Sequence, residues 1–279
     1  MTRTMTQTMP ALFISHGSPD TAIADTEAAR WLKQLARDLP RPRAIVVVSA
    51  HFEIAGGVAV SADPQPETIH DFGGFAPELY QMQYPAPGEP ELARRIAHDL
   101  QAKGFAAGAI PSRGFDHGVW VPLMLIYPEA DIPVVSVSVD PRQGPEHHFK
   151  LGQALSVLGA EGVLVIGSGS FTHNLGEAFK ALRCGNRTAA VPDWVSRFTA
   201  WMGEKLAAND VAALLDYRRA APFAVENHPT DEHLLPLYVA MGAAGEGGAA
   251  RIVHDSAEFG VLAMTMWRFD PAMSEASAA

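Results

Sequence analysis

The sequence predicts an α/β fold: one domain with a central, mostly parallel (mixed) sheet flanked by helices on both faces. Short apolar runs of strand length alternate along the chain with amphipathic helical patterns, which is typical of parallel sheets with crossover helices. The run 44–50 is rich in β-branched residues without polar alternation, which indicates a strand buried on both faces. Hydrophobic residues make up 48% of the 279-residue chain and charged residues 19%, so the chain has enough apolar material for a large core.

Strands are expected where short apolar runs are bounded by turn residues. In chain order these runs are 11–15, 44–50, 57–61, 132–140, 162–170, 251–255 and 259–269. Helices are expected where apolar residues recur with a period near 3.6, as Ala28, Leu32, Leu35 and Leu39 do. The segments with this pattern are 26–39, 90–104, 145–160 and 192–209. Residues 10–270 therefore form the predicted single domain, with residues 1–9 as a flexible leader and 271–279 as a disordered tail.

The composition excludes several classes of protein. The formal net charge is −10 and no cluster of Lys and Arg is present, so we expect no nucleic-acid partner. A single cysteine, Cys184, permits neither an internal disulfide nor a cysteine-based zinc cluster. The N-terminal residues lack the apolar segment of a signal peptide, and no apolar run approaches the ~20 residues that span a bilayer. We therefore expect a cytoplasmic protein without a membrane partner.

Three of the eleven histidines stand at the ends of predicted strands. His16, His51 and His173 each follow a β-type apolar run and lie near a turn. Ligands of open α/β sheets bind outside the carboxyl ends of the strands, so these three side chains would converge if their strands are neighbours. By contrast, His98, His147 and His148 fall among charged residues in helical patterns, where a solvent-facing position is expected.

Clustered histidines suit two kinds of metal chemistry. Three His ligands with one open position describe a catalytic Zn²⁺ site, whereas two His and one carboxylate describe a non-haem Fe(II) site. A further histidine that does not bind the metal would serve as an acid/base. The sequence contains neither a phosphate-binding P-loop motif, nor H-E-x-x-H, nor the G-x-S-x-G elbow of hydrolases.

The segment 62–88 interrupts the alternation of strands and helices. It is rich in Pro, Gly and aromatic residues, among them Phe72, Phe75 and Tyr84. A loop of this length in a compact domain is usually functional or disordered, and its aromatic residues argue against disorder. We therefore expect it to form a wall or lid over a pocket.

Six segments together resemble a known family. In chain order they are PALFISHGSP, RAIVVVSAHFE, TIHDFGGFAPELYQMQYPAPG, GFDHGVWVPLMLIYPEADIPVVSVSVD, THNL and PTDEHLLPLY. The sequence resembles the DODA-type (4,5-DOPA extradiol dioxygenase-like) branch of the LigB-like class III extradiol ring-cleaving dioxygenases, from about residue 10 to the final strand. The resemblance implies a metal-dependent oxidoreductase that inserts O₂ into a small catechol, DOPA-like or related.

The resemblance also implies a role for individual residues. The histidines of SHGSP, SAHFE and PTDEH would be the metal ligands, namely His16, His51 and His233. His173 would be the catalytic acid/base, and an additional ligand when no substrate is present, with His117 as a second catalytic histidine that contacts substrate or oxygen. His228 ranks below His233 as a ligand. The implied substrate-binding residues are His70, Asp71, Phe72, Phe75 and Tyr84.

The implied cofactor is one divalent metal per chain, with O₂ as cosubstrate. Other LigB-type enzymes use a carboxylate as third ligand, whereas this branch has a histidine there, so the site suits Fe(II) for dioxygenase activity and equally Zn(II) as the bound metal. The expected partner is a small-molecule catechol, and a homo-oligomer is left open. Two alternatives stand beside the dioxygenase: a zinc-dependent hydrolase, and a non-catalytic zinc-binding protein on the same scaffold.

Overall fold

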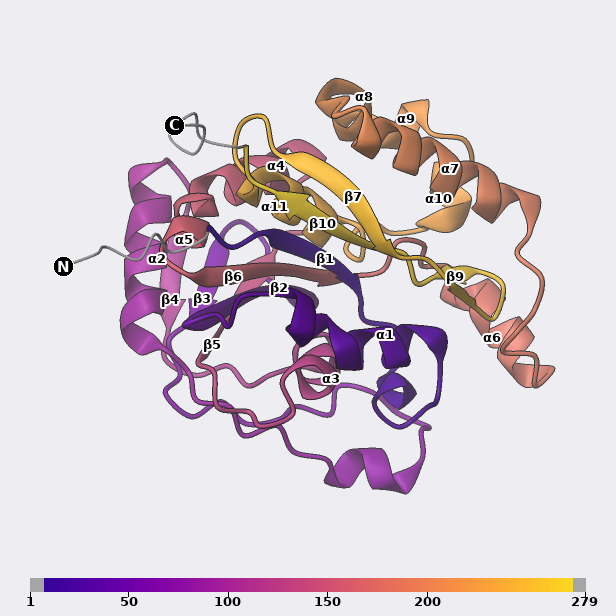
Figure 1. The fold of residues 1–279 in the computed structure, drawn as a ribbon, viewed down its shortest axis with the longest axis horizontal. Helices are drawn as coiled ribbons and strands as arrows, with labels where there is room; N and C mark the ends of the chain where they lie inside the picture. The colour runs from indigo at the N-terminus through magenta and orange to yellow at the C-terminus, as the bar shows by residue number, and fades with distance from the viewer. Residues whose placement is uncertain (1–7, 273–279) are drawn as a thin grey trace.

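An eight-stranded mixed sheet runs through the centre of the protein (Figure 1). The structure is a computed structural model that describes residues 8–272, so the predictions for residues 1–7 and 273–279 lie outside the described part. The strand order is β4-β3-β5-β2-β6-β1-β10-β7. The bounds are β1 Ala11–Ser15, β2 Ala44–Glu53, β3 Val58–Ser61, β4 Ala107–Ile110, β5 Val134–Val139, β6 Val163–Gly169, β7 Ala249–His254 and β10 Met266–Asp270. A separate antiparallel pair consists of β8 (Ala257–Glu258) and β9 (Leu262–Ala263).

The four central strands β5, β2, β6 and β1 are parallel to one another. At one edge β10 and β7 add antiparallel pairs, and at the other β3 pairs antiparallel with β5 and parallel with β4. The predicted fold class, a mostly parallel but mixed sheet, is confirmed. Because the central strands run in the same direction, their carboxyl ends meet at one edge of the sheet.

Helices cover both faces of the sheet (Figure 1). The α-helices are α1 Glu27–Leu35, α2 Pro90–Ala102, α3 His117–Ile126, α4 Pro145–Leu155, α5 Val157–Ala160, α6 Leu175–Arg183, α7 Asp193–Ala207, α8 Val211–Leu215, α9 Tyr217–Ala220, α10 Ala224–Asn227 and α11 Leu235–Ala243. Short 3₁₀ helices are η1 Pro19–Ala22, η2 Ala36–Asp38 and η3 Pro77–Gln81. No helix in residues 8–272 is long and apolar enough to cross a membrane.

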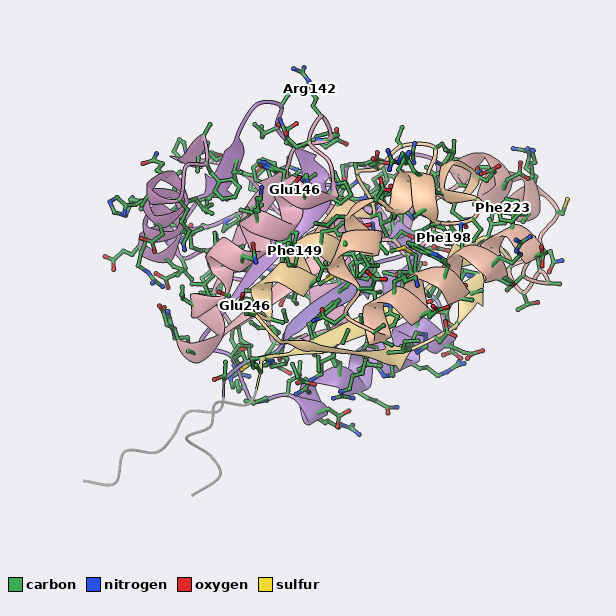
Figure 2. All side chains as sticks on the ribbon, turned by 90° about the horizontal axis from the view of Figure 1, so that it is seen from above. Arg142, Glu146, Phe149, Phe198, Phe223 and Glu246 are labelled. Carbon is green, nitrogen blue, oxygen red and sulfur yellow. The ribbon has the colours of Figure 1, made fainter. Side chains whose placement is uncertain are left out.

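Alternate residues of the central strands supply two apolar cores. Phe13 and Val46 point toward α2, α4 and α11, whereas Leu12 and Val47 point toward α1 and α3. Figure 2 looks onto the first of these sides, where Phe149 of α4 and Phe198 of α7 lie. The continuous β-branched run predicted this two-sided burial, since strands covered on both faces need apolar residues at every position.

The structure corrects several predicted elements. The segment 145–160 is two helices that meet at Ser156, and the apolar stretch 259–269 divides into β9 and β10. His233 lies before α11, and Pro236 occupies the first turn of that helix, where its missing N–H costs no hydrogen bond. Met9 is no part of a flexible leader, because its side chain is buried and its N–H donates to the Gly159 carbonyl.

The expectation of a solvent-facing His148 is wrong. Its side chain is 0% exposed, and both ring nitrogens are used. Nδ1 donates to the Gly144 carbonyl at 3.0 Å, and Nε2 accepts from the Asp140 N–H at 3.2 Å. Burial lowers the pKa of His148 to about 4, with the backbone bond to Gly144 opposing the shift and His147 adding to it.

We therefore expect His148 to make the protein less stable in mild acid. Because the unfolded state binds a proton at this residue near pH 6.5 and the folded state only near pH 4, the free energy of unfolding falls as the pH drops between these values. From pH 7 to pH 5 the contribution of His148 is about 2 kcal/mol. Urea titrations of metal-free wild type and His148→Gln at both pH values measure it. Equal losses in the two proteins would contradict the assignment.

Candidate active site and metal centre

Five histidines meet at the carboxyl edge of the central strands. His16 directly follows β1, His51 lies near the end of β2, and His173 lies in the loop after β6. These strands are neighbours in the order β2-β6-β1, so the expected convergence of the three side chains is confirmed. The other two come from helix ends: His117 is the first residue of α3, and His233 lies in the turn before α11.

The Nε2 atom of His51 lies close to the Nε2 atoms of two other histidines. The Nε2 atom of His51 lies 3.1 Å from that of His16 and 3.2 Å from that of His233. Two imidazole nitrogens that bind one metal ion at about 2.1 Å lie about 3.0 to 3.4 Å apart. The separations therefore fit a common metal ion between the three rings.

The hydrogen bonds of His16 determine which of its nitrogens is free. Ser168 Oγ donates its single proton to the Gly118 carbonyl, so toward His16 it can only accept. His16 Nδ1, 3.0 Å away, is therefore the donor, and its Nε2 carries a lone pair. Metal-binding histidines commonly donate their second N–H to an oxygen in this way, which orients the ring.

Two carboxylates hold the other rings. Asp71 accepts from His117 Nδ1 at 3.0 Å with one oxygen, and its other oxygen lies 3.5 Å from His51 Nδ1. Glu232 Oε1 accepts from His233 Nδ1 at 3.0 Å and lies 3.9 Å from His173 Nδ1. Unprotonated Nε2 atoms that face one another at these distances repel unless a cation lies between them. The donor set therefore fits a divalent metal held by His16, His51 and His233.

Burial keeps these imidazoles neutral at physiological pH. It lowers the pKa of His51 to about 3, and places the pKa values of His16 and His233 well below the ordinary value, with the neighbouring histidines adding to the effect. Burial opposes ionisation of Asp71, but hydrogen bonds from His117 outweigh it and lower the Asp71 pKa to about 2. Neutral imidazoles beside an ionised Asp71 are the protonation states that metal binding requires.

His173 and His117 stand beside this group of three. The His173 ring stacks on the His233 ring with centroids 3.4 Å apart and an interplanar angle of 13°. The His117 ring lies 3.9 Å from that of His51. Burial is the main reason that the pKa of His173 falls to about 4, and the nearby His228 lowers this pKa further. Both side chains therefore flank the metal-binding nitrogens and remain in contact with the adjoining cavity.

A cavity of about 320 Å³ opens beside the histidines. All five histidines line it, together with Asp71, Phe72 and Phe75 from the long loop. On the opposite side it is bounded by α6 and by Phe259 and Leu262 from the β8–β9 region. The expectation that the segment 62–88 forms a wall over a pocket agrees with this arrangement.

Three of the proposed site residues lie elsewhere. The Tyr84 side chain is 1% exposed and donates to the Tyr127 carbonyl within the core. His70 lies behind the aromatic wall, where Nε2 donates to the Met82 carbonyl. His228 is fully buried and Nε2 donates to the Phe171 carbonyl. None of the three side chains lines the cavity. Each donates its hydrogen bond to a backbone carbonyl that lies outside the cavity.

Sequence reasoning missed Glu232, Ser168 and helix α6. Glu232 directly precedes His233 in the quoted motif PTDEH, and Ser168 lies in the predicted strand 162–170. The start of α6 also carries a signal, since the Asn174 side chain accepts from the Glu177 N–H as an N-cap. The sequence does not show which two histidines each carboxylate contacts, because these histidines come from different segments of the chain.

Gly169 allows the turn that carries His233 to approach β6. A Cβ atom at this position would lie 2.1 Å from the His233 carbonyl oxygen, and the next residue, Ser170, donates its N–H to that same oxygen. We expect Gly169→Ala to displace the turn and to weaken metal binding by about tenfold or more, at a cost in stability of about 1–3 kcal/mol. Metal competition with a chelator and urea unfolding measure the two effects.

The matched control is Gly108→Ala in β4, where an added Cβ meets no atom within 4 Å. This variant should bind metal as wild type does. If Gly169→Ala and Gly108→Ala bound metal equally, the close approach would not position His233.

The fold and the histidine cluster define a class of metal-dependent α/β enzymes, and comparison with known proteins identifies the family. Residues 9–268 match the family described as the catalytic LigB subunit of aromatic ring-opening dioxygenase. The chain therefore belongs to the LigB family. Similar proteins include a 4,5-DOPA dioxygenase extradiol of Beta vulgaris, 42% identical over 261 residues that cover 92% of this chain and 95% of that protein.

A protein of the same description from Escherichia coli (strain K12) is 38% identical, over 92% of this chain and 93% of its own length. A crystal structure of an uncharacterized protein from Escherichia coli K12 has a TM-score of 0.76 and 32% identity, covering 93% of this chain and 99% of that one. Together these relatives place the chain in the DODA-type branch, as an extradiol ring-cleaving dioxygenase.

Proposed function

We propose that this protein uses Fe(II), held by His16, His51 and His233, to cleave the ring of a small catechol, DOPA or a related compound, with O₂. The observation that carries the proposal is the convergence of the three Nε2 atoms beside the 320 Å³ cavity. When bound, the metal supplies a template for both reactants and a path for electrons between them. The remaining roles belong to side chains of this chain.

His173 is the proposed acid/base. Its ring lines the cavity beside His233, and its lowered pKa leaves it neutral and able to accept a proton from a substrate hydroxyl. His117 donates from Nδ1 to Asp71, so Nε2 is the nitrogen available to the diol. From this position His117 would stabilise charge that develops on the diol.

Phe72 and Phe75 are the proposed cover for the substrate ring. Their rings pack edge to face with centroids 5.5 Å apart, and Phe72 also lies edge-on to His117 at 5.9 Å. Both side chains line the cavity, so an aromatic substrate next to the histidines would contact them. They would thereby exclude water from the reacting atoms.

The test is anaerobic reconstitution with one equivalent of Fe(II), followed by addition of L-DOPA or another catechol and then O₂. We expect a yellow ring-fission product, with one O₂ consumed per catechol. The Zn(II)-loaded protein is the matched control and should be inactive, because zinc has no redox chemistry. Hydrolysis of esters or amides by the zinc form, without oxygen uptake by the iron form, would instead support a zinc hydrolase. A metal-loaded protein that binds no catechol would indicate a non-catalytic role.

A further inference from the structure

One wall of the cavity is an apolar stripe on α6. Leu175, Ala178, Phe179 and Leu182 occupy positions i, i+3, i+4 and i+7, so they share one face of the helix, and all four line the cavity. Only Ala178 is buried, whereas Leu175, Phe179 and Leu182 are 44 to 49% exposed. Large apolar side chains gathered at the mouth of a binding cavity indicate contact with an apolar ligand.

The stripe faces further apolar groups. Phe72 and Phe75 line the same cavity from the long loop, and Phe259 and Leu262 line it next to α6. The histidines lie at the inner end of this space, since His16 and His233 are 2% and 5% exposed. A catechol bound with its two oxygens at the histidines would therefore direct a ring substituent toward the apolar walls.

Within the described part of the chain, the acidic side chains that line the cavity are not matched by any lining cation. Among the described residues that line it, none is Lys or Arg, while Asp20 and Asp71 are present. Arg187, next to the rim, donates to Asp20 at 2.9 and 3.3 Å and to Glu258 at 2.7 and 2.8 Å. The Arg187 guanidinium is therefore paired with two carboxylates. The Asp20 carboxylate in turn accepts hydrogen bonds from both Arg187 and Ser18.

A substrate carboxylate in this space would lose water without gaining a cationic partner, which is unfavourable. A substrate ammonium would find the Asp20 oxygens already occupied. We infer that the preferred substrate is a catechol with an uncharged, apolar substituent, such as an alkyl chain, received between the α6 stripe and the wall of Phe72 and Phe75. This inference rests on the proposed function and names the substrate class of the same site.

The experiment compares ligands of equal length on the metal-loaded protein without O₂. Titration calorimetry gives the Kd of 4-propylcatechol, 3-(3,4-dihydroxyphenyl)propionate, L-DOPA and unsubstituted catechol. We expect 4-propylcatechol to bind about tenfold or more tightly than the propionate or L-DOPA. With O₂ and Fe(II), the same order should appear in KM. Tighter binding of either charged compound, or binding of none, would overturn the inference.

A variant pair tests the stripe itself. Leu182→Gln should weaken binding of 4-propylcatechol about fivefold and leave unsubstituted catechol unchanged. The matched control is Val157→Gln on α5, which is 53% exposed and does not line the cavity, and it should change neither Kd. Unchanged selectivity in Leu182→Gln would count against the stripe as a substrate contact. Selective binding without ring cleavage by the iron form would contradict the proposed function, while the selectivity of the cavity for an apolar substituent would still hold.

Discussion

His173→Gln should lower kcat by a factor of about 10² to 10⁴ without removing the metal. The side chain lines the cavity and stacks on His233, but its ring is not among the three whose Nε2 atoms converge. Gln keeps a polar group of similar size yet cannot exchange a proton near neutral pH. Steady-state turnover of a catechol and metal analysis of the same sample measure the two properties separately.

The control for this experiment is His98→Gln on α2, whose side chain is exposed to solvent and only contacts Asp99. It should retain the wild-type kcat. Full turnover by His173→Gln would exclude the acid/base role. Loss of the metal from His173→Gln would instead make His173 a ligand.

His51→Ala should remove the metal almost completely. His51 is the central member of the group, because its Nε2 atom contacts those of both His16 and His233. Loss of a residue that only orients a ligand typically costs 10- to 100-fold in metal affinity, so loss of a ligand should exceed about 100-fold. Dialysis against a chelator, followed by metal analysis, measures the change.

His70→Ala is the matched control for metal binding. It also removes an imidazole next to the cavity wall, but His70 bonds to the Met82 carbonyl rather than to the histidine cluster. It should therefore retain its metal under the same dialysis. Retention of the metal by His51→Ala would show that the three converging nitrogens are not the binding site.

Local sequence patterns predicted the strands and helices whose burial requires a recognisable pattern of apolar residues. The β-branched run of β2 and the apolar period of α1 identified these elements because each has the pattern that its burial requires. Helix α3 escaped prediction, since it is buried nearly all round and therefore lacks an amphipathic period. Pro122 within α3 argued further against a helix there, whereas Pro236 obscured only where α11 begins.

The candidate site was predictable as a set of histidines but not as a geometry. Strand ends indicated that His16, His51 and His173 would meet, and the resemblance added His117 and His233. No local pattern distinguishes His70, whose neighbours Asp71 and Phe72 line the cavity, from a cavity residue. Its place behind the wall depends on the bond to Met82, which is twelve residues away and is fixed only when the whole loop folds.

The two carboxylates also determine the charge balance of the centre. Asp71 and Glu232 each contact a proposed metal ligand and one of its neighbouring histidines, and none of the described residues that line the cavity is Lys or Arg. A divalent cation held by neutral imidazoles would carry two uncompensated positive charges. The two carboxylates would balance these charges from beside the histidines that they contact, without binding the metal themselves. With His16, His51 and His233 as the proposed ligands, the centre would be electroneutral without an acidic ligand, and a coordination position would be left for substrate.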